Sequence, residues 1–337
     1  MKKQNGSGAT TQDIARLSGV STATVSYVLS GRKGVRISQQ TRERVLEAAK
    51  RLHYRRNALA TALRKGRTNT LGIVAPYSVV GQPSSSHLVY GKDLILALTF
   101  AAARLGMGVM LYVDSPDSPL TPEHVTDRRV DGVVLSGIYG VREWVDSIVS
   151  SGTSCVEIGS TYGEYQVHPD NALGSRFAVE HLLTLGHRRI VHWRGPESAL
   201  AARERSDTFS TLMAGAGVPE PERQVVSSAE EIERLFLLPE RPTAIFTYND
   251  NRAVDAYHLL HKLGLRIPED VSIVGFDNDI RAVSVLPPLT TVQNPVDEIA
   301  DSAVRLLVDQ IEGGASGREV VRIPNHLVAR ESTGPAP

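Results

Sequence analysis

Polar side chains follow two β-rich runs and begin one predicted helix in the second half of the chain. Asn249 and Asp250 follow TAIFTY, and Asp277 and Asn278 follow VSIVGF. Arg205 lies early in the helix predicted at 200–216. A carboxylate, a carboxamide and a guanidinium converging on one cleft would fix donor and acceptor directions and could bracket the hydroxyls of a sugar or similar polyol. The alternative is that Asn249 and Asp277 only cap helices and that Arg205 is a surface side chain.

A different chemistry is indicated at the start of the chain. Residues 1–67 hold 15 basic and three acidic side chains, a net charge of +12, whereas the remaining 270 residues hold 22 basic and 34 acidic ones, a net charge of −12. The formal charge of zero for all 337 residues is therefore the sum of opposite net charges on these two segments. Such asymmetry indicates an arm that binds a polyanion, joined to a body that does not.

Residues 10–29 within this arm predict two short helices separated by a tight turn. Thr10 or Thr11 can cap the first helix, Gly19 can end it, and Ser21 can cap the second. This spacing is typical of a helix-turn-helix, whose second helix enters the DNA major groove. That helix would present Thr22, Ala23, Ser26 and Tyr27. The alternative is a small helical bundle with a solvated basic surface.

A third helix is predicted from Ser38, followed by the short segment NALATALRKG at 57–66. About ten residues are too few for a stable free helix, so we expect this segment to fold when DNA holds it. Leu63 is a candidate wedge for a minor-groove base step, although it could instead be a linker leucine packed on the body.

From Leu71 onward, strand-like runs alternate with helical ones, which is typical of parallel sheets with crossover helices. The runs occupy 71–77, 108–113, 132–138, 154–159, 189–193, 243–248 and 271–276. The helices are predicted at 88–104, 141–150, 173–185, 200–216, 229–237 and 250–263. Two doubly wound subdomains fit this count, with the ligand beyond the carboxyl ends of the strands, where Tyr77 is a further candidate.

Several stretches in this order resemble the lactose-repressor (LacI/GalR) family of bacterial transcription regulators. They include DIARLSGVSTATVSYVLSG, VEHLLTLGHRRI, FTYNDNRAVDAYHLLHKLGLRIPEDVSIVGFDN and PPLTTVQNP. The resemblance implies an α/β protein with an N-terminal three-helix helix-turn-helix DNA-binding domain (1–56), a hinge helix and linker (57–67), and a periplasmic-binding-protein-like, Rossmann-like effector domain (68–337). We expect the latter to comprise subdomain N, at about 68–160 and 292–318, and subdomain C, at about 161–291 and 319–332.

The resemblance also implies roles for individual residues. Thr22, Ala23 and Tyr27 match base-reading positions, and Tyr27 departs from the arginine that many members have there, so the operator half-site should differ. Effector contacts are implied for Arg205, Asn249, Asp277 and Gln293. Further DNA contacts are expected from Thr11, Ser21, Thr24, Ser26, Ser38 and Thr41, and from Asn57, Ala60 and Leu63 of the hinge helix. Gly159 stands where sugar-responsive relatives often have an acidic residue.

The expected function is that of a homodimeric transcriptional regulator, a repressor, which binds palindromic operator DNA and a small, sugar-like effector. The dimer would use the face of helix 88–104 and the region around 276–286. Alternatives are a solute-binding protein of a transport system and a sugar- or nucleoside-processing enzyme. No GxxxxGK[ST], HExxH or GxSxG motif occurs, so no catalytic residue, metal or cofactor is expected. Without a secretory signal or a membrane span, a cytoplasmic, nucleoid-associated protein is expected.

Overall fold

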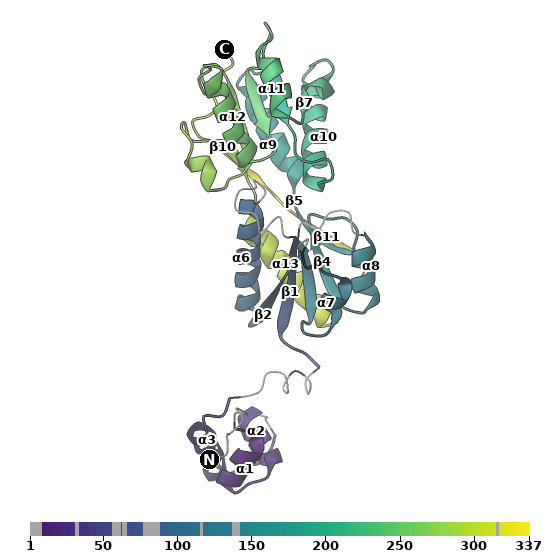
Figure 1. Ribbon diagram of the computed structural model, residues 1–337, viewed down its shortest axis with the longest axis vertical. Helices are drawn as coiled ribbons and strands as arrows, with labels where there is room; N and C mark the ends of the chain where they lie inside the picture. The colour runs from purple at the N-terminus through teal and green to yellow at the C-terminus, as the bar shows by residue number, and fades with distance from the viewer. Residues whose placement is uncertain are drawn as a thin grey trace. The chain divides into compact units, whose positions relative to one another are not determined.

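The computed structural model describes residues 9–30, 34–55, 62, 66–76, 88–114, 117–136, 142–314 and 317–337 (Figure 1). The chain divides into two compact units, Met1–Thr68 and Asn69–Pro337.

The described part of the first unit contains three helices, α1 (Thr11–Ser18), α2 (Thr22–Ser30) and α3 (Gln39–Arg51). Thr10 caps α1 in a reciprocal capping box with Asp13, and Gly19 ends this helix in the left-handed region at φ +66°. The hydroxyl of Ser21 accepts a hydrogen bond from the Thr24 amide at 3.2 Å. These contacts confirm the predicted starts of the first two helices.

One apolar cluster holds these helices together. Ile14 of α1, Val25 and Val28 of α2, and Val45 and Ala48 of α3 are all buried in it. Because each helix alone is too short to be stable in water, this shared core stabilises all three. The predicted helix-turn-helix is therefore present.

The second unit contains two six-stranded sheets within the described residues, each covered by helices on both faces (Figure 1). The first sheet has the order β11-β5-β4-β3-β1-β2 and is parallel throughout. Its strands are β1 (Thr70–Pro76), β2 (Gly108–Asp114), β3 (Gly132–Ser136), β4 (Ser154–Ile158), β5 (Tyr165–Pro169) and β11 (Glu319–Ile323). The covering helices are α6 (Leu88–Arg104), α7 (Pro122–Thr126), α8 (Arg142–Ser150) and α13 (Val296–Ile311).

Alternate residues of these strands belong to different cores, as a doubly wound sheet requires. Leu71 and Ile73 of β1 pack with α6 and α13, whereas Val74 packs with α7 and α8. Cys155 lies in the second of these clusters, where burial raises the pKa of its thiol. A thiol buried among apolar side chains in this way is expected to be unreactive.

The second sheet has the order β12-β10-β9-β8-β6-β7, with β12 antiparallel at the edge. Its strands are β6 (Ile190–Trp193), β7 (Val225–Val226), β8 (Ala244–Thr247), β9 (Ser272–Asp277), β10 (Thr290–Gln293) and β12 (His326–Val328). One face packs on α9 (Asn171–Thr184) and α10 (Leu200–Gly215), the other on α11 (Ala229–Phe236) and α12 (Asp250–Lys262). The 3-10 helices η1 (Pro221–Gln224) and η2 (Ile280–Val283) complete this subdomain.

The predicted subdomain boundaries need correction. Strands β5 and β11 belong to the first sheet, so 165–169 and 319–323 lie in subdomain N and not in subdomain C as predicted. The chain crosses between subdomains after β5, after β10 and after β11. These strands were not predicted because YQVHP and EVVRI are short and mix polar with apolar residues, so they lack the continuous apolar run of a central strand.

Candidate functional site

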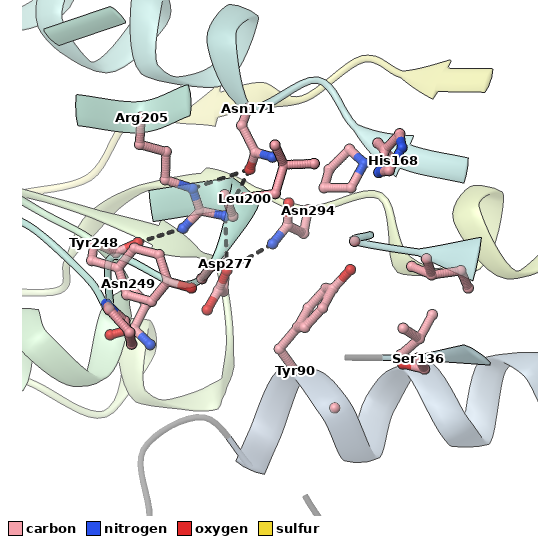
Figure 2. A pocket seen from close by; sticks show the side chains of 18 of the residues that line it. Tyr90, Ser136, His168, Asn171, Leu200, Arg205, Tyr248, Asn249, Asp277 and Asn294 are labelled. Atoms are coloured by element: carbon pink, nitrogen blue, oxygen red, sulfur yellow. Dashed lines mark hydrogen bonds and ion pairs between the residues drawn. The ribbon is translucent and has the colours of Figure 1, made fainter. Parts of the chain in front are cut away.

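A cavity of about 220 Å³ lies between the two sheets, close to the carboxyl ends of their strands (Figure 2). The first subdomain contributes Tyr90, Ser136, Ile158 and Gly159 to its wall, and the second contributes Arg205, Tyr248, Asn249 and Asp277. Its polar lining also includes His168 of β5, Asn171, Ser198 and Asn294. This is the place where the strand order predicts a ligand.

Arg205 is the buried cation of this cavity, with only 3% of the residue exposed. Its Nε and Nη2 donate to Oδ1 of Asn171 at 3.1 and 2.9 Å, and its Nη1 donates to the backbone carbonyl of Tyr248. The guanidinium carbon lies 3.4 Å from the centre of the Phe276 ring. The alternative interpretation, in which Arg205 is a surface side chain, is therefore wrong. Three hydrogen bonds and an aromatic ring fix the orientation of its planar guanidinium.

Asp277 is the counter-ion of Arg205. Its Oδ1 lies 3.9 Å from Arg205 Nη2 and accepts a hydrogen bond from Asn294 Nδ2 at 2.7 Å. Burial raises the pKa of Asp277 to about 7, while the Arg205 charge acts in the opposite direction. The residue also has φ +108°, a conformation that is costly for a side chain other than glycine. Asp279, rather than Asp277, caps the following 3-10 helix, so the capping alternative for Asp277 is wrong.

Asn249 serves as a helix cap and also lines the cavity. Its Oδ1 accepts from the Arg252 amide at 3.0 Å at the start of α12. Asp250 next to it is fully buried and bonds to Thr291 Oγ1 at 2.5 Å and to the Asp279 amide at 2.8 Å. Burial and the neighbouring carboxylate raise the Asp250 pKa well above its usual range. Asp250 thus links β10 to the segment that follows β9.

The structure does not bring Gln293 into this cavity. Its Oε1 lies 3.4 Å from Asn278 Nδ2 and 3.2 Å from His326 Nε2, in an adjoining groove between α6 and the ends of β9 and β10. Tyr77 lies outside the described residues, so its predicted contact stays a prediction. Gly159 lines the cavity with φ +77° and open space where a side chain would begin.

Three buried asparagines, which the sequence analysis did not single out, join the cavity to the three crossovers. Asn171 follows the crossover after β5, and its Nδ2 donates to Glu204 Oε2 at 2.8 Å. Asn294 follows β10, and Asn325 follows β11 and donates to Asn294 Oδ1 at 2.8 Å. Asp170 and Asn171 directly follow β5, just as Asn249 and Asp250 follow a predicted strand. Had β5 been predicted from the sequence, the same rule would have identified Asp170 and Asn171 as candidates.

The predicted DNA-contacting residues lie on and beside α2. Ser21, Thr22 and Ala23 are exposed, whereas Thr24, Ser26 and Tyr27 are half-buried. On the neighbouring helices, Ser38 is exposed and caps α3, and Thr11 and Thr41 are half-buried. Asn57, Ala60 and Leu63 of the predicted hinge helix lie outside the described residues.

Comparisons with known proteins agree with both units. A family model described as bacterial regulatory proteins, lacI family, matches residues 10–57, and one described as a periplasmic binding protein-like domain matches 179–333. The ribose operon repressor of Escherichia coli (strain K12) is 31% identical over 96% of this chain and 99% of its own length. The chain belongs to the lacI family. The HTH-type transcriptional regulator DegA of Bacillus subtilis (strain 168) is 30% identical over 97% of this chain and 98% of its own.

Solved structures of lacI-family proteins share the fold. A complex of the transcriptional regulator CelR with cellobiose has a TM-score of 0.69 and 28% identity, covering 96% of this chain and 99% of that one. The lac repressor dimer bound to operator and an anti-inducer has a TM-score of 0.81 at 23% identity, covering 97% and 100%. DegA and the ribose operon repressor are named as a transcriptional regulator and a repressor.

Two further findings concern the described residues only. No helix there is long and apolar enough to cross a membrane. No group of three or more His, Cys, Asp or Glu side chains there is arranged to hold a metal ion.

Proposed function

We propose that this lacI-family protein represses transcription by binding a palindromic operator as a homodimer, and that a small sugar-like effector in the cavity controls this binding. The observation that carries the proposal is the Arg205–Asp277 pair, held in a cavity between two subdomains of a chain that also has a helix-turn-helix. The protein would act in the cytoplasm, at the nucleoid, and would not transform its effector chemically.

The DNA-binding half of the proposal rests on α2. Thr22 and Ala23 are exposed at its start, where a recognition helix contacts base edges, and Tyr27 lies one turn further on. Ser21 and Thr24 carry hydroxyls 2.9 Å apart next to this surface and are suited to phosphate oxygens. The net charge of +12 over residues 1–67 supplies the sequence-independent part of the affinity.

The dimer is supported by exposed apolar side chains on the surface that the sequence analysis singled out. Leu96 and Phe100 of α6 are 54% and 55% exposed, and Ile280, Val283 and Leu286 around η2 are between 56% and 88% exposed. Large apolar side chains grouped on a surface mark an interaction site. A second copy of the chain would cover them and bring two copies of α2 to the two half-sites of a palindrome.

The effector half rests on donors and acceptors that remain available in the cavity. Arg205 has five N–H groups, and its hydrogen bonds to Asn171 and Tyr248 use three of them, which leaves donors for an effector oxygen. Asp277 Oδ2 can accept from an effector hydroxyl. Since asparagines at all three crossovers connect to this pair, effector binding would change the subdomain arrangement. Operator and effector affinities would then be reciprocally coupled.

Selection of DNA duplexes tests the first half directly. The full chain is incubated with a randomised duplex pool at moderate salt, and bound duplexes are sequenced. We expect enrichment of a palindrome, and we expect Thr22→Ala and Tyr27→Ala to relax base preference at separate positions of each half-site. Arg203→Met, which changes an exposed arginine on α10, is the control and should leave the enriched sequence unchanged. Absence of any enriched duplex would contradict the proposal and favour a solute-binding protein.

A second measurement addresses the enzyme alternative. The purified chain is incubated with the metabolite mixture that changes its operator affinity, and the mixture is compared before and after incubation. The proposal requires every component to be recovered unchanged, whereas turnover of the effector would support a sugar- or nucleoside-processing enzyme.

A further inference from the structure

We infer that the ion pair between Glu204 and Arg322 is a latch between the two subdomains, and that effector binding at Arg205 acts on operator affinity through it. The inference rests on the proposed function and deepens it, because it names the contact through which the cavity regulates DNA binding. Two observations carry it: the pair crosses the subdomain boundary, and hydrogen bonds connect it to Arg205.

The two partners of this pair belong to different subdomains. Glu204 lies in α10, which packs on the second sheet, whereas Arg322 lies in β11 of the first sheet. Nη2 of Arg322 donates to Oε1 of Glu204 at 2.8 Å. Among the ion pairs between described residues, this one alone joins the two subdomains. A movement of the subdomains that separates α10 from β11 would therefore break this contact.

Glu204 is connected to the cavity through Asn171. Its second oxygen, Oε2, accepts from Asn171 Nδ2 at 2.8 Å. Asn171 Oδ1 in turn accepts from Arg205 Nη2 at 2.9 Å, a contact that Figure 2 shows as a dashed line. The amide group of Asn171 thus uses its donor toward the latch and its acceptor toward the guanidinium. An effector oxygen that displaces Arg205 would displace Asn171 and Glu204 with it.

The latch lies beside two of the three crossovers. Arg322 is paired in register with His168 of β5, which also lines the cavity. Directly after these two residues, the backbone amide of Asp170 donates to the carbonyl of Ile323 at 2.7 Å and joins the two crossovers. The ion pair therefore acts where the chain passes between the subdomains, and its loss should loosen the hydrogen bond of the Asp170 amide.

The strength of the pair is modest. The side chain of Glu204 is 17% exposed and that of Arg322 is 45% exposed, so water and salt screen their attraction. A partly exposed ion pair changes an equilibrium by about two- to fivefold. A contact of this strength biases one subdomain arrangement over another without fixing it, as an equilibrium that a ligand can shift requires.

Charge-removing variants of the full chain test the latch. Glu204→Gln keeps an oxygen that can accept from Asn171 but removes the charge, and Arg322→Gln removes the other partner. With the selected operator and no effector, we expect each variant to change the operator Kd by about two- to fivefold, both in the same direction. The concentration of the responding metabolite mixture at half-maximal response should change as well, because operator and effector affinities are coupled. The double variant should match the single ones, since either substitution already opens the latch.

Amide hydrogen exchange measures the opening of the latch in the absence of DNA and effector. We expect the Asp170 amide to exchange about two- to fivefold faster in both single variants than in the wild type. Glu180→Gln is the matched control, because it removes a carboxylate that lies 3.6 Å from Arg176 within α9 and spans no boundary. This control should leave both the exchange at Asp170 and the operator Kd unchanged.

Three outcomes would overturn the inference. Variants that accelerate exchange at Asp170 but keep the wild-type operator Kd and effector response would show that the pair only stabilises the fold. Effects that add up in the double variant would show that Glu204 and Arg322 act independently. In both of these outcomes the proposed function stands. A wild-type chain that enriches no operator, or responds to no metabolite, would instead contradict the proposed function, and the latch with it.

Discussion

Arg205 and Asp277 are buried charges whose positions depend on oxygen and nitrogen atoms from several elements. A buried charge is costly unless it is paired and hydrogen-bonded, and Arg205 meets this condition through Asn171, Tyr248 and Asp277. The positive φ of Asp277 adds a backbone cost on the order of 1–3 kcal/mol. Costs of this kind concentrate where a protein binds a ligand, so the pair is explained by effector recognition better than by stability.

The first prediction concerns the shape of the Arg205 side chain. Arg205→Lys keeps the charge beside Asp277, but a single ammonium cannot reach both Asn171 Oδ1 and the Tyr248 carbonyl as the planar fork does. We expect the free energy of unfolding to fall by about 1–3 kcal/mol and effector affinity to fall by at least tenfold. Titration of operator release by the metabolite mixture that changes operator affinity measures the second effect. The control is Arg203→Lys, whose side chain donates only to exposed carbonyls of the preceding loop. An equal loss in both variants would contradict the prediction.

The second prediction concerns pH and Asp277. Its pKa is about 7 in the folded chain and 3.8 in the ordinary carboxyl. Between these values the unfolded chain has lost the proton and the folded chain has kept it, so this group destabilises the folded chain increasingly as pH rises. The unfolding free energy of Asp277→Asn relative to wild type should therefore increase from about pH 4 to about pH 7 and level off above. Urea unfolding across this range measures it, with Asp309→Asn, an exposed carboxyl, as control. A difference that declines with pH would refute the assignment.

At the scale of elements, the central strands were predictable and the crossover strands were not. VSIVGF and TAIFTY are mostly apolar because helices cover both of their faces, and this pattern is visible in a sequence. YQVHP ends in proline and has polar residues at alternate positions, although Gln166 and His168 are buried through hydrogen bonds to each other. Hydrogen bonding between partners determines such a strand, and periodicity does not reveal it. Asn171 was missed for that reason, whereas Arg205, Asn249 and Asp277 were placed correctly in the cavity wall.

The loop before α10 permits a prediction at this scale. A Cβ at Gly195 would lie 2.6 Å from atoms of the Tyr248 ring, so Gly195→Ala must displace this ring and with it the carbonyl that accepts from Arg205. We expect a loss of about 1–3 kcal/mol in the free energy of unfolding and a weaker effector response. Gly215→Ala, at the end of α10 with open space around the new methyl, is the control and should be neutral or slightly stabilising. Thermal unfolding and operator release measure both variants. Full effector sensitivity in Gly195→Ala would show that Tyr248 is not needed to hold Arg205.

At the scale of the whole molecule, opposite charges separate the two binding functions. Residues 1–67 carry +12 and the remaining residues carry −12, so the acidic body is repelled by the polyanion that the basic arm binds. Lysines and arginines that neutralise phosphates release counterions from DNA, and operator affinity then depends steeply on salt. The proposed sugar-like effector, by contrast, is not a polyanion, so its binding is expected to release no such ions.

Salt should therefore distinguish the two ligands of one chain. Between about 50 and 200 mM salt, operator affinity is expected to fall by about 10³- to 10⁵-fold if six to ten phosphates are contacted. Over the same range the affinity of the effector for the DNA-free protein should change less than about twofold, since an uncharged ligand displaces no counterions. Fluorescence anisotropy of labelled operator and calorimetry with the purified effector measure the two dependences. An effector affinity that falls in parallel with operator affinity would mean that the cavity binds an anion and not an uncharged, sugar-like effector.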